Sequence, residues 1–144
     1  MPTRGAAPDR ATLSRLLREA RTIAVVGLSP NPARPSHEVA SYLQDAGYHI
    51  VPVRPAVESV LGERAYPDLA SAARAVGTID IVNVFRRSEF VAALADPLLA
   101  IRPSLVWLQV GVRDAETARR LTEAGIPVVM DRCLMAEHPF LVSD

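Results

Sequence analysis

Five short hydrophobic runs, separated by longer amphipathic stretches, dominate the pattern of this chain. They lie at residues 23–26, 49–53, 79–84, 104–108 and 126–130. Val, Ile and Leu prevail in them with little strict alternation of apolar and polar positions, which is typical of strands covered by helices on both faces. The pattern therefore predicts five buried strands of a largely parallel sheet.

The stretches between the runs have apolar residues at helical spacing. An opening helix is expected over about residues 10–20, before the first strand. Ser36 is the expected N-cap of a second helix, which should stop at Gly47 because glycine readily adopts the left-handed conformation that ends helices. The N-caps expected for later helices are Ser88, Asp96 and Asp114.

Strands and helices that alternate in this way predict an α/β fold of three layers, α/β/α, around a mostly parallel five-stranded sheet. A chain of 144 residues suits one domain over residues 1–144, with residues 1–9 expected as a flexible tail. Pro127 places the fifth run at an edge of the sheet, since proline cannot donate to a central ladder. Pro52 lies inside the second run, and it likewise conflicts with a central position of that strand in the sheet.

Composition and charge narrow the classes of function. The formal net charge is zero, which argues against nonspecific nucleic-acid binding. All 16 basic residues are arginine, and each guanidinium can make a planar, bidentate contact to phosphate. The apolar runs are too short to span a bilayer and no signal peptide is evident, so a cytoplasmic protein without membrane contact is expected. A single cysteine, Cys133, excludes an internal disulfide, and no metal site is expected.

The turn after the first strand carries the strongest indication of a ligand, because parallel α/β sheets bind ligands beyond the carboxyl ends of their strands. Residues 27–32 read GLSPNP, so only the first glycine of the dinucleotide motif G-x-G-x-x-G is present. The helix that follows still offers free amides and a positive dipole end to an anion. With Ser29, Arg34 and Ser36 nearby, this turn predicts a phosphate site.

Arg54 follows the second strand, where an NAD site would need a carboxylate to accept from the ribose hydroxyls. The first carboxylate after it is that of Glu58. An arginine at this place favours an adenosine that carries an additional ribose phosphate, at the 2′ position in NADP or at the 3′ position in coenzyme A. The residues alone leave both cofactors open.

In these same segments the chain resembles the family of small CoA-binding domains, relatives of the nucleotide domain of the succinyl-CoA synthetase alpha subunit. The resemblance covers residues 21–141 and rests on VVGLS at 25–29, RPS at 34–36, VFRRS at 84–88, VWLQVG at 106–111 and MDRC at 130–133. It implies a Rossmann-like domain that binds coenzyme A, with phosphates near the first loop and adenine near the second and third strand ends.

The resemblance also implies roles for individual residues. Residues of the first loop would contact the phosphates, and residues after the third strand would flank the nucleotide. Gln109 and Gly111 would form part of the pocket wall. The family often has Asn-Pro after the second strand, so the role of Arg54 rests on its own chemistry. Together the expected binding residues are Gly27, Leu28, Ser29, Pro30, Arg34, Pro35, Ser36, Arg54, Pro55, Phe85, Arg86, Arg87, Gln109, Gly111 and Arg132.

Three functions remain open from the sequence. The first is a protein that binds coenzyme A or an acyl-CoA without catalysis, acting through a protein partner or as a homo-oligomer. The second is an NADP-binding oxidoreductase, although the chain contains no lysine for a Tyr/Lys acid pair. The third is an interaction module with a vestigial pocket. No catalytic residue is expected, and Cys133 is either a small core residue or a thiol able to pair with the thiol of CoA.

Overall fold

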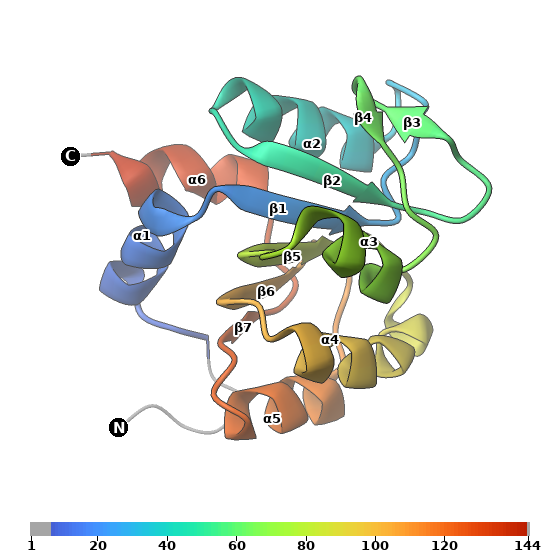
Figure 1. The fold of residues 1–144 in the computed structure, drawn as a ribbon. Coiled ribbons are helices and arrows are strands. Elements are labelled where there is room, and N and C mark those ends of the chain that lie inside the picture. The colour runs from blue at the N-terminus through green and yellow to red at the C-terminus, as the bar shows by residue number, and fades with distance from the viewer. Residues whose placement is uncertain (1–6, 144) are drawn as a thin grey trace.

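The computed structural model describes residues 7–143 and has a parallel sheet of five strands at its centre (Figure 1). Along the sheet the strands follow the order β2-β1-β5-β6-β7. Their bounds are β1 (Thr22–Val26), β2 (His49–Val53), β5 (Ile81–Val84), β6 (Leu105–Leu108) and β7 (Val128–Val129). All four pairings between neighbours are parallel, as the hydrophobic runs predict.

Within the described residues, six α-helices cover the two faces of this sheet (Figure 1). One face packs against α1 (Arg10–Glu19), α2 (Pro35–Asp45) and α6 (Leu134–Val142). The opposite face packs against α3 (Leu69–Val76), α4 (Ala95–Ile101) and α5 (Ala115–Glu123). Residues of each strand alternate between the two cores, because successive side chains of a strand point to opposite faces. The expected three-layer, Rossmann-like α/β architecture is confirmed.

A proline lies in or directly before each of the two edge strands of the sheet. The fifth run forms the edge strand β7, directly after Pro127, as expected. β2 is the other edge strand, and the carbonyl of its Pro52 accepts from the amide of Tyr66 at 3.0 Å. The N–H and C=O of one strand residue point to the same side, so the missing N–H of Pro52 costs no bond to β1. The edge position resolves the conflict that this proline raised.

Several helix boundaries differ from the expected ones. The N-cap of α2 is Arg34 rather than Ser36, with Pro35 as the first helical residue. The helix expected from Ser88 is replaced by two 3₁₀ turns, η1 (Ser88–Phe90) and η2 (Ala92–Leu94), which run directly into α4. Asp96 is therefore not an N-cap; it lies in the first turn of α4 and pairs with Arg120. The prediction for Asp114 is confirmed, since its side chain accepts from Thr117 N–H.

Three elements were not expected from the sequence: α3, α6 and a small hairpin of β3 (Ser59–Val60) and β4 (Glu63–Arg64). Of the expected N-terminal tail, residues 1–6 lie outside the described part of the chain, while Asp9 accepts from Thr12 N–H and caps α1. Within residues 7–143, no helix is long and apolar enough to cross a membrane, and no cluster of His, Cys, Asp and Glu could hold a metal ion.

A buried histidine joins α6 to the neighbouring elements. The hydroxyl of Tyr48 donates to the carbonyl of Leu17 at 2.6 Å, so its oxygen accepts from Nε2–H of His138 at 3.0 Å. Nδ1 of His138 is then left to accept from the hydroxyl of Tyr42 at 2.9 Å. Burial lowers the pKa of His138 and raises the pKa of Tyr48 to about 12. This arrangement favours the neutral imidazole.

We expect His138 to make the protein less stable in acid. Below about pH 6.5, the ordinary value for histidine, the unfolded chain takes up a proton that the folded protein accepts only at lower pH. The free energy of unfolding therefore falls as the pH drops through this interval. Urea unfolding at about pH 8 and pH 5 should show a smaller loss of stability in His138→Gln than in the wild type. An equal loss in both proteins would contradict the assignment.

Candidate functional site

The sheet order creates a switch point between β1 and β5. The chain leaves β1 towards β2 on one side and later returns to form β5 on the other side. Ligands of open α/β sheets bind at such points, beyond the carboxyl ends of the strands. A cavity of about 860 Å³ lies there and extends over the ends of β1, β5 and β6 to the start of α6. Its position agrees with the position predicted from the sequence.

Eleven of the predicted residues line this one cavity: Gly27, Ser29, Arg34, Pro35, Ser36, Arg54, Phe85, Arg86, Arg87, Gln109 and Gly111.

Gly27 allows β1 and β5 to approach each other at the floor of the cavity. Its φ angle is 84°, in the left-handed region, and a Cβ atom at this position would lie 2.3 Å from the carbonyl oxygen of Phe85. Only glycine fits such a close approach at a positive φ. The amide of Gly27 also donates to the carbonyl of Val53 at 2.8 Å. The first glycine of the motif is thus required by the backbone.

Side-chain hydrogen bonds hold the loop between β1 and α2. The amide of Ser29 donates to Oγ of Ser36 at 3.0 Å, and the amide of Asn31 donates to Oγ of Ser29 at 3.1 Å. Oδ1 of Asn31 accepts from the amide of Ala33 at 3.0 Å. The buried hydroxyl of Ser36 therefore braces the loop instead of capping the helix. Within residues 7–143 the amide of Ser36 has no acceptor, as expected in the first turn of a helix.

Loss of the Ser36 hydroxyl should destabilise this loop. In Ser36→Ala the amide of Ser29 would remain buried without an acceptor, which costs about 1–3 kcal/mol of unfolding free energy. The measurement is urea unfolding, with Ser59→Ala as the matched control, because Ser59 is exposed on the β3–β4 hairpin and should change stability by less than about 0.5 kcal/mol. Equal effects of the two substitutions would show that the Ser36 hydroxyl does not brace the loop.

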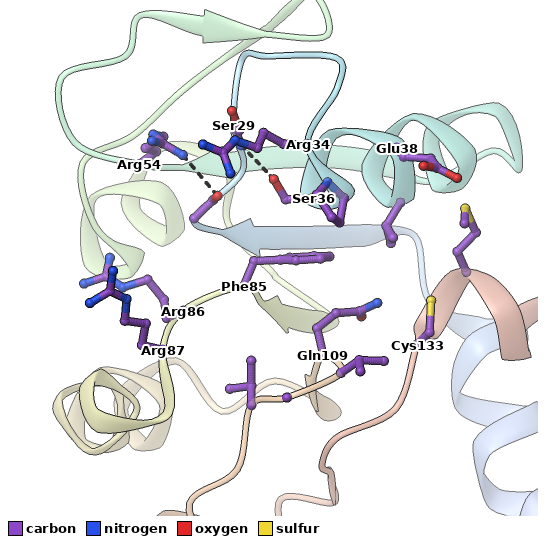
Figure 2. A pocket seen from close by; sticks show the side chains of 17 residues that line it. Ser29, Arg34, Ser36, Glu38, Arg54, Phe85, Arg86, Arg87, Gln109 and Cys133 are labelled. Carbon is purple, nitrogen blue, oxygen red and sulfur yellow. Dashed lines mark hydrogen bonds between the residues drawn. The ribbon is translucent and has the colours of Figure 1, made fainter.

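Four arginines give the cavity its charge. Nη1 of Arg54 donates to the carbonyl of Gly27 at 3.3 Å, and Arg86 lies over the ring of Phe90. Among the described residues, no carboxylate lies within 4 Å of Arg34, Arg54 or Arg86, while Arg87 is 3.8 Å from Glu89. Figure 2 shows Arg54, Arg86 and Arg87 at one end of the cavity, with Arg34 beside the first loop. This end of the cavity attracts anions.

The opposite end of the cavity has a different chemistry. Cys133 and Glu38 lie there in Figure 2, and Gln109 lies between them and the arginines. Gln109 is only 6% exposed, and its Oε1 accepts from the amide of Leu134 at 3.4 Å and from Nδ2 of Asn83 at 3.3 Å. Met135, two residues after Cys133, also lines the cavity.

Four predicted residues do not line the cavity. Leu28 is completely buried in the core, whereas Pro30 and Pro55 are exposed outside the lining. The guanidinium of Arg132 pairs with Glu137, with Nε 2.8 Å from Oε2, and lies over the ring of Trp107. This hydrogen bond raises the pKa of Arg132. Its own salt bridge therefore holds Arg132 away from the cavity.

Two further residues in this region make structural contacts. Trp107 is fully buried, and its indole N–H donates to the carbonyl of Arg132 at 2.8 Å. Asp131 is engaged in ion pairing rather than acid–base chemistry, since it accepts from Gly111 N–H at 2.6 Å and from Arg113 at 3.3 Å. These hydrogen bonds lower the pKa of Asp131.

The sequence prediction missed several residues of the lining. Val110 and Val112 flank Gly111 in the loop after β6, and they could have been found by reading that whole loop as lining. Glu38 and Val39 follow Ser36 on the cavity side of α2. Met135 enters through α6, which the sequence pattern did not indicate. The lining residues absent from the predicted set are Glu38, Val39, Val110, Val112, Cys133 and Met135.

Known proteins share this fold. The sequence matches the CoA binding domain family over residues 21–139, so the chain belongs to that family. The uncharacterized protein YneT of Bacillus subtilis (strain 168) is 41% identical over 131 residues, which cover 91% of this chain and 95% of YneT.

Solved structures with the same fold include "cell-free ID.343" from Thermus thermophilus and a hypothetical protein from Pyrococcus horikoshii OT3. The first is 42% identical with a TM-score of 0.87 and covers 93% of this chain and 99% of its own. The second is 29% identical with a TM-score of 0.87 and covers 99% of this chain and 97% of its own. The likeness extends over nearly the whole length of each protein.

Proposed function

We propose that this protein binds coenzyme A or an acyl-CoA in the cavity at the switch point, without catalysis of its own. The observation that carries the proposal is the concentration of arginines around the free N-terminus of α2. Arg34, Arg54 and Arg86 line one cavity, and no carboxylate of the described residues neutralises them. A ligand with several phosphates would supply the missing negative charge.

The residues present fit coenzyme A better than a plain dinucleotide. The diphosphate would be held by the amide of Ser36 and by Arg34, at the positive end of the α2 dipole. Arg54 stands at the end of β2, where a ribose phosphate of the adenosine is recognised in folds of this class. The loop lacks the second and third glycines that allow a dinucleotide to approach the backbone closely. Family membership supports the same ligand.

The lining chemistry supports binding without catalysis. A nucleophile or general base works in hydrogen-bond contact with a second group that activates or orients it. Among the described residues, neither Glu38 nor the thiol of Cys133 has such a partner in the cavity. The remaining charged groups of the lining are arginines, which stay protonated and are suited to hold phosphates.

Isothermal titration calorimetry at fixed salt concentration tests the proposal with three ligands. Coenzyme A should bind, dephospho-CoA should bind more weakly because it lacks the 3′-phosphate, and NADP should bind weakly or not at all. Failure of CoA to bind would contradict the proposal. Tighter binding of NADP than of CoA would replace it with an NADP-binding function.

A further inference from the structure

The cavity is polarised along its length. At one end are the guanidiniums of Arg54, Arg86 and Arg87, and at the other end are the thiol of Cys133 and the carboxylate of Glu38 (Figure 2). The carboxylate disfavours phosphate at its own end, whereas the arginines attract phosphate to theirs. A ligand with a polyanionic head and an uncharged tail would therefore enter in one direction, with its tail towards Cys133.

The side-chain amide of Gln109, between the two ends, has one unpaired donor. Oε1 of Gln109 accepts from the backbone amide of Leu134, and only an oxygen can accept there, so the orientation of the amide group is fixed. Its Nε2 group is then turned into the cavity and has no acceptor among residues 7–143. Gln109 is 94% buried as a residue, and its unpaired Nε2 is placed to donate to a ligand in the cavity, such as a carbonyl of an amide-containing tail.

The thiol of Cys133 lies just beyond this amide. Cys133 occupies the N-cap position of α6, yet its side chain makes no capping hydrogen bond. It is partly exposed and lines the cavity. Arg132 and His138, the nearest basic side chains in sequence, are turned away into contacts with Glu137 and with the two tyrosines. The sulfur is thus unengaged and open to the cavity.

We propose that Cys133 is the residue at which this protein forms a mixed disulfide with coenzyme A, whose amide-containing arm passes Gln109; this inference rests on the proposed function. The reactant is a disulfide of coenzyme A. Sγ of Cys133, as the thiolate, attacks one sulfur of that disulfide. The S–S bond of the reactant breaks, a bond forms between Sγ and the CoA sulfur, and the second CoA leaves as a thiolate that takes up the proton released by Cys133. The disulfide exchange needs no further oxidant.

The test compares two disulfides that share this chemistry but differ in the nucleotide. Reduced protein is mixed with CoA disulfide or with glutathione disulfide, and the adduct is followed by intact-protein mass spectrometry. Binding brings the reacting sulfurs together, so CoA disulfide should react at least about tenfold faster. The adduct should map to Cys133 and disappear with dithiothreitol. Equal rates for the two disulfides, or no adduct with CoA disulfide, would overturn the inference.

Two controls test whether the faster reaction with CoA disulfide depends on binding in the cavity. Adenosine 3′,5′-bisphosphate, which has phosphates but no thiol, should remove the advantage of CoA disulfide without changing the rate with glutathione disulfide. Arg34→Gln should have the same effect, whereas Arg64→Gln, which removes an equal charge from the hairpin outside the cavity, should keep the advantage. If CoA disulfide still reacted faster than glutathione disulfide in the presence of the competitor and in Arg34→Gln, the assigned orientation of the ligand would be contradicted.

Titration of Cys133→Ser with reduced CoA separates the two proposals. If this variant binds CoA while the wild type shows no preference for CoA disulfide, the disulfide inference fails and the proposed function stands. If neither protein binds CoA, the proposed function itself fails.

Discussion

Gly27→Ala should destabilise the protein by about 2–5 kcal/mol and remove ligand binding, because a β-carbon has no space at this position. It would meet the carbonyl oxygen of Phe85 at 2.3 Å, and the φ angle of 84° is strained for any residue with a side chain. Relief of the overlap requires the ends of β1 and β5 to move apart. Those ends form the floor of the cavity. Urea unfolding measures the loss of stability, and calorimetry with CoA measures the loss of binding.

A second glycine provides a matched control for Gly27. Gly62 also has a positive φ angle, 77°, but nothing lies within 4 Å of the position that its Cβ would take. Gly62→Ala should therefore cost only the conformational strain, about 1–2 kcal/mol, and leave binding unchanged, since the β3–β4 hairpin lies outside the cavity lining. Equal losses of stability in the two variants would show that the approach to Phe85 is not the cause.

Arg54→Gln should reduce the affinity for coenzyme A roughly 10- to 100-fold, as expected from the loss of a hydrogen bond to a charged group. The affinity for dephospho-CoA should change little, because that ligand lacks the phosphate assigned to Arg54. The variant would therefore lose most of the discrimination between the two ligands. Calorimetric titration of both ligands into both proteins gives the four dissociation constants needed.

Arg64→Gln is the control for charge in this titration. Arg64 lies on the neighbouring hairpin, outside the cavity lining, so its removal changes the net charge equally and should leave both affinities nearly unchanged. If Arg54→Gln weakened CoA and dephospho-CoA by the same factor, Arg54 would contact a group that the two ligands share, and its assignment to the 3′-phosphate would be wrong.

The core of the fold was predictable because strands buried on both faces leave a clear signal. The five hydrophobic runs contain the five strands of the sheet except for Thr22, the first residue of β1, and Pro127 correctly indicated an edge. α3 also carried a signal that could have been read: Asp68 caps it, and Leu69, Ala72 and Val76 follow at helical spacing. α6 did not, because its apolar residues lie on several sides and Pro139 interrupts the sequence pattern of a helix.

The candidate site was predictable to the extent that it consists of strand ends. Sequence order alone places Ser29, Arg54 and Phe85 after their strands, and the parallel sheet then brings them to one edge. The direction in which a side chain points is harder to predict from the sequence, since it depends on tertiary partners. Arg132 follows β7 as predicted, yet a carboxylate one helical turn into α6 holds its guanidinium away from the cavity. The sequence analysis considered the thiol of Cys133 but did not place Cys133 and Met135 in the cavity lining, because it did not predict α6.

The decisive measurement is a crystal structure of the protein with coenzyme A. We expect the diphosphate at the amide of Ser36, the 3′-phosphate at the guanidinium of Arg54, and the thiol-bearing arm passing Gln109 towards Cys133. A ligand whose phosphates lie at the Cys133 end, or which binds outside the cavity at the ends of β1 and β5, would contradict this expectation.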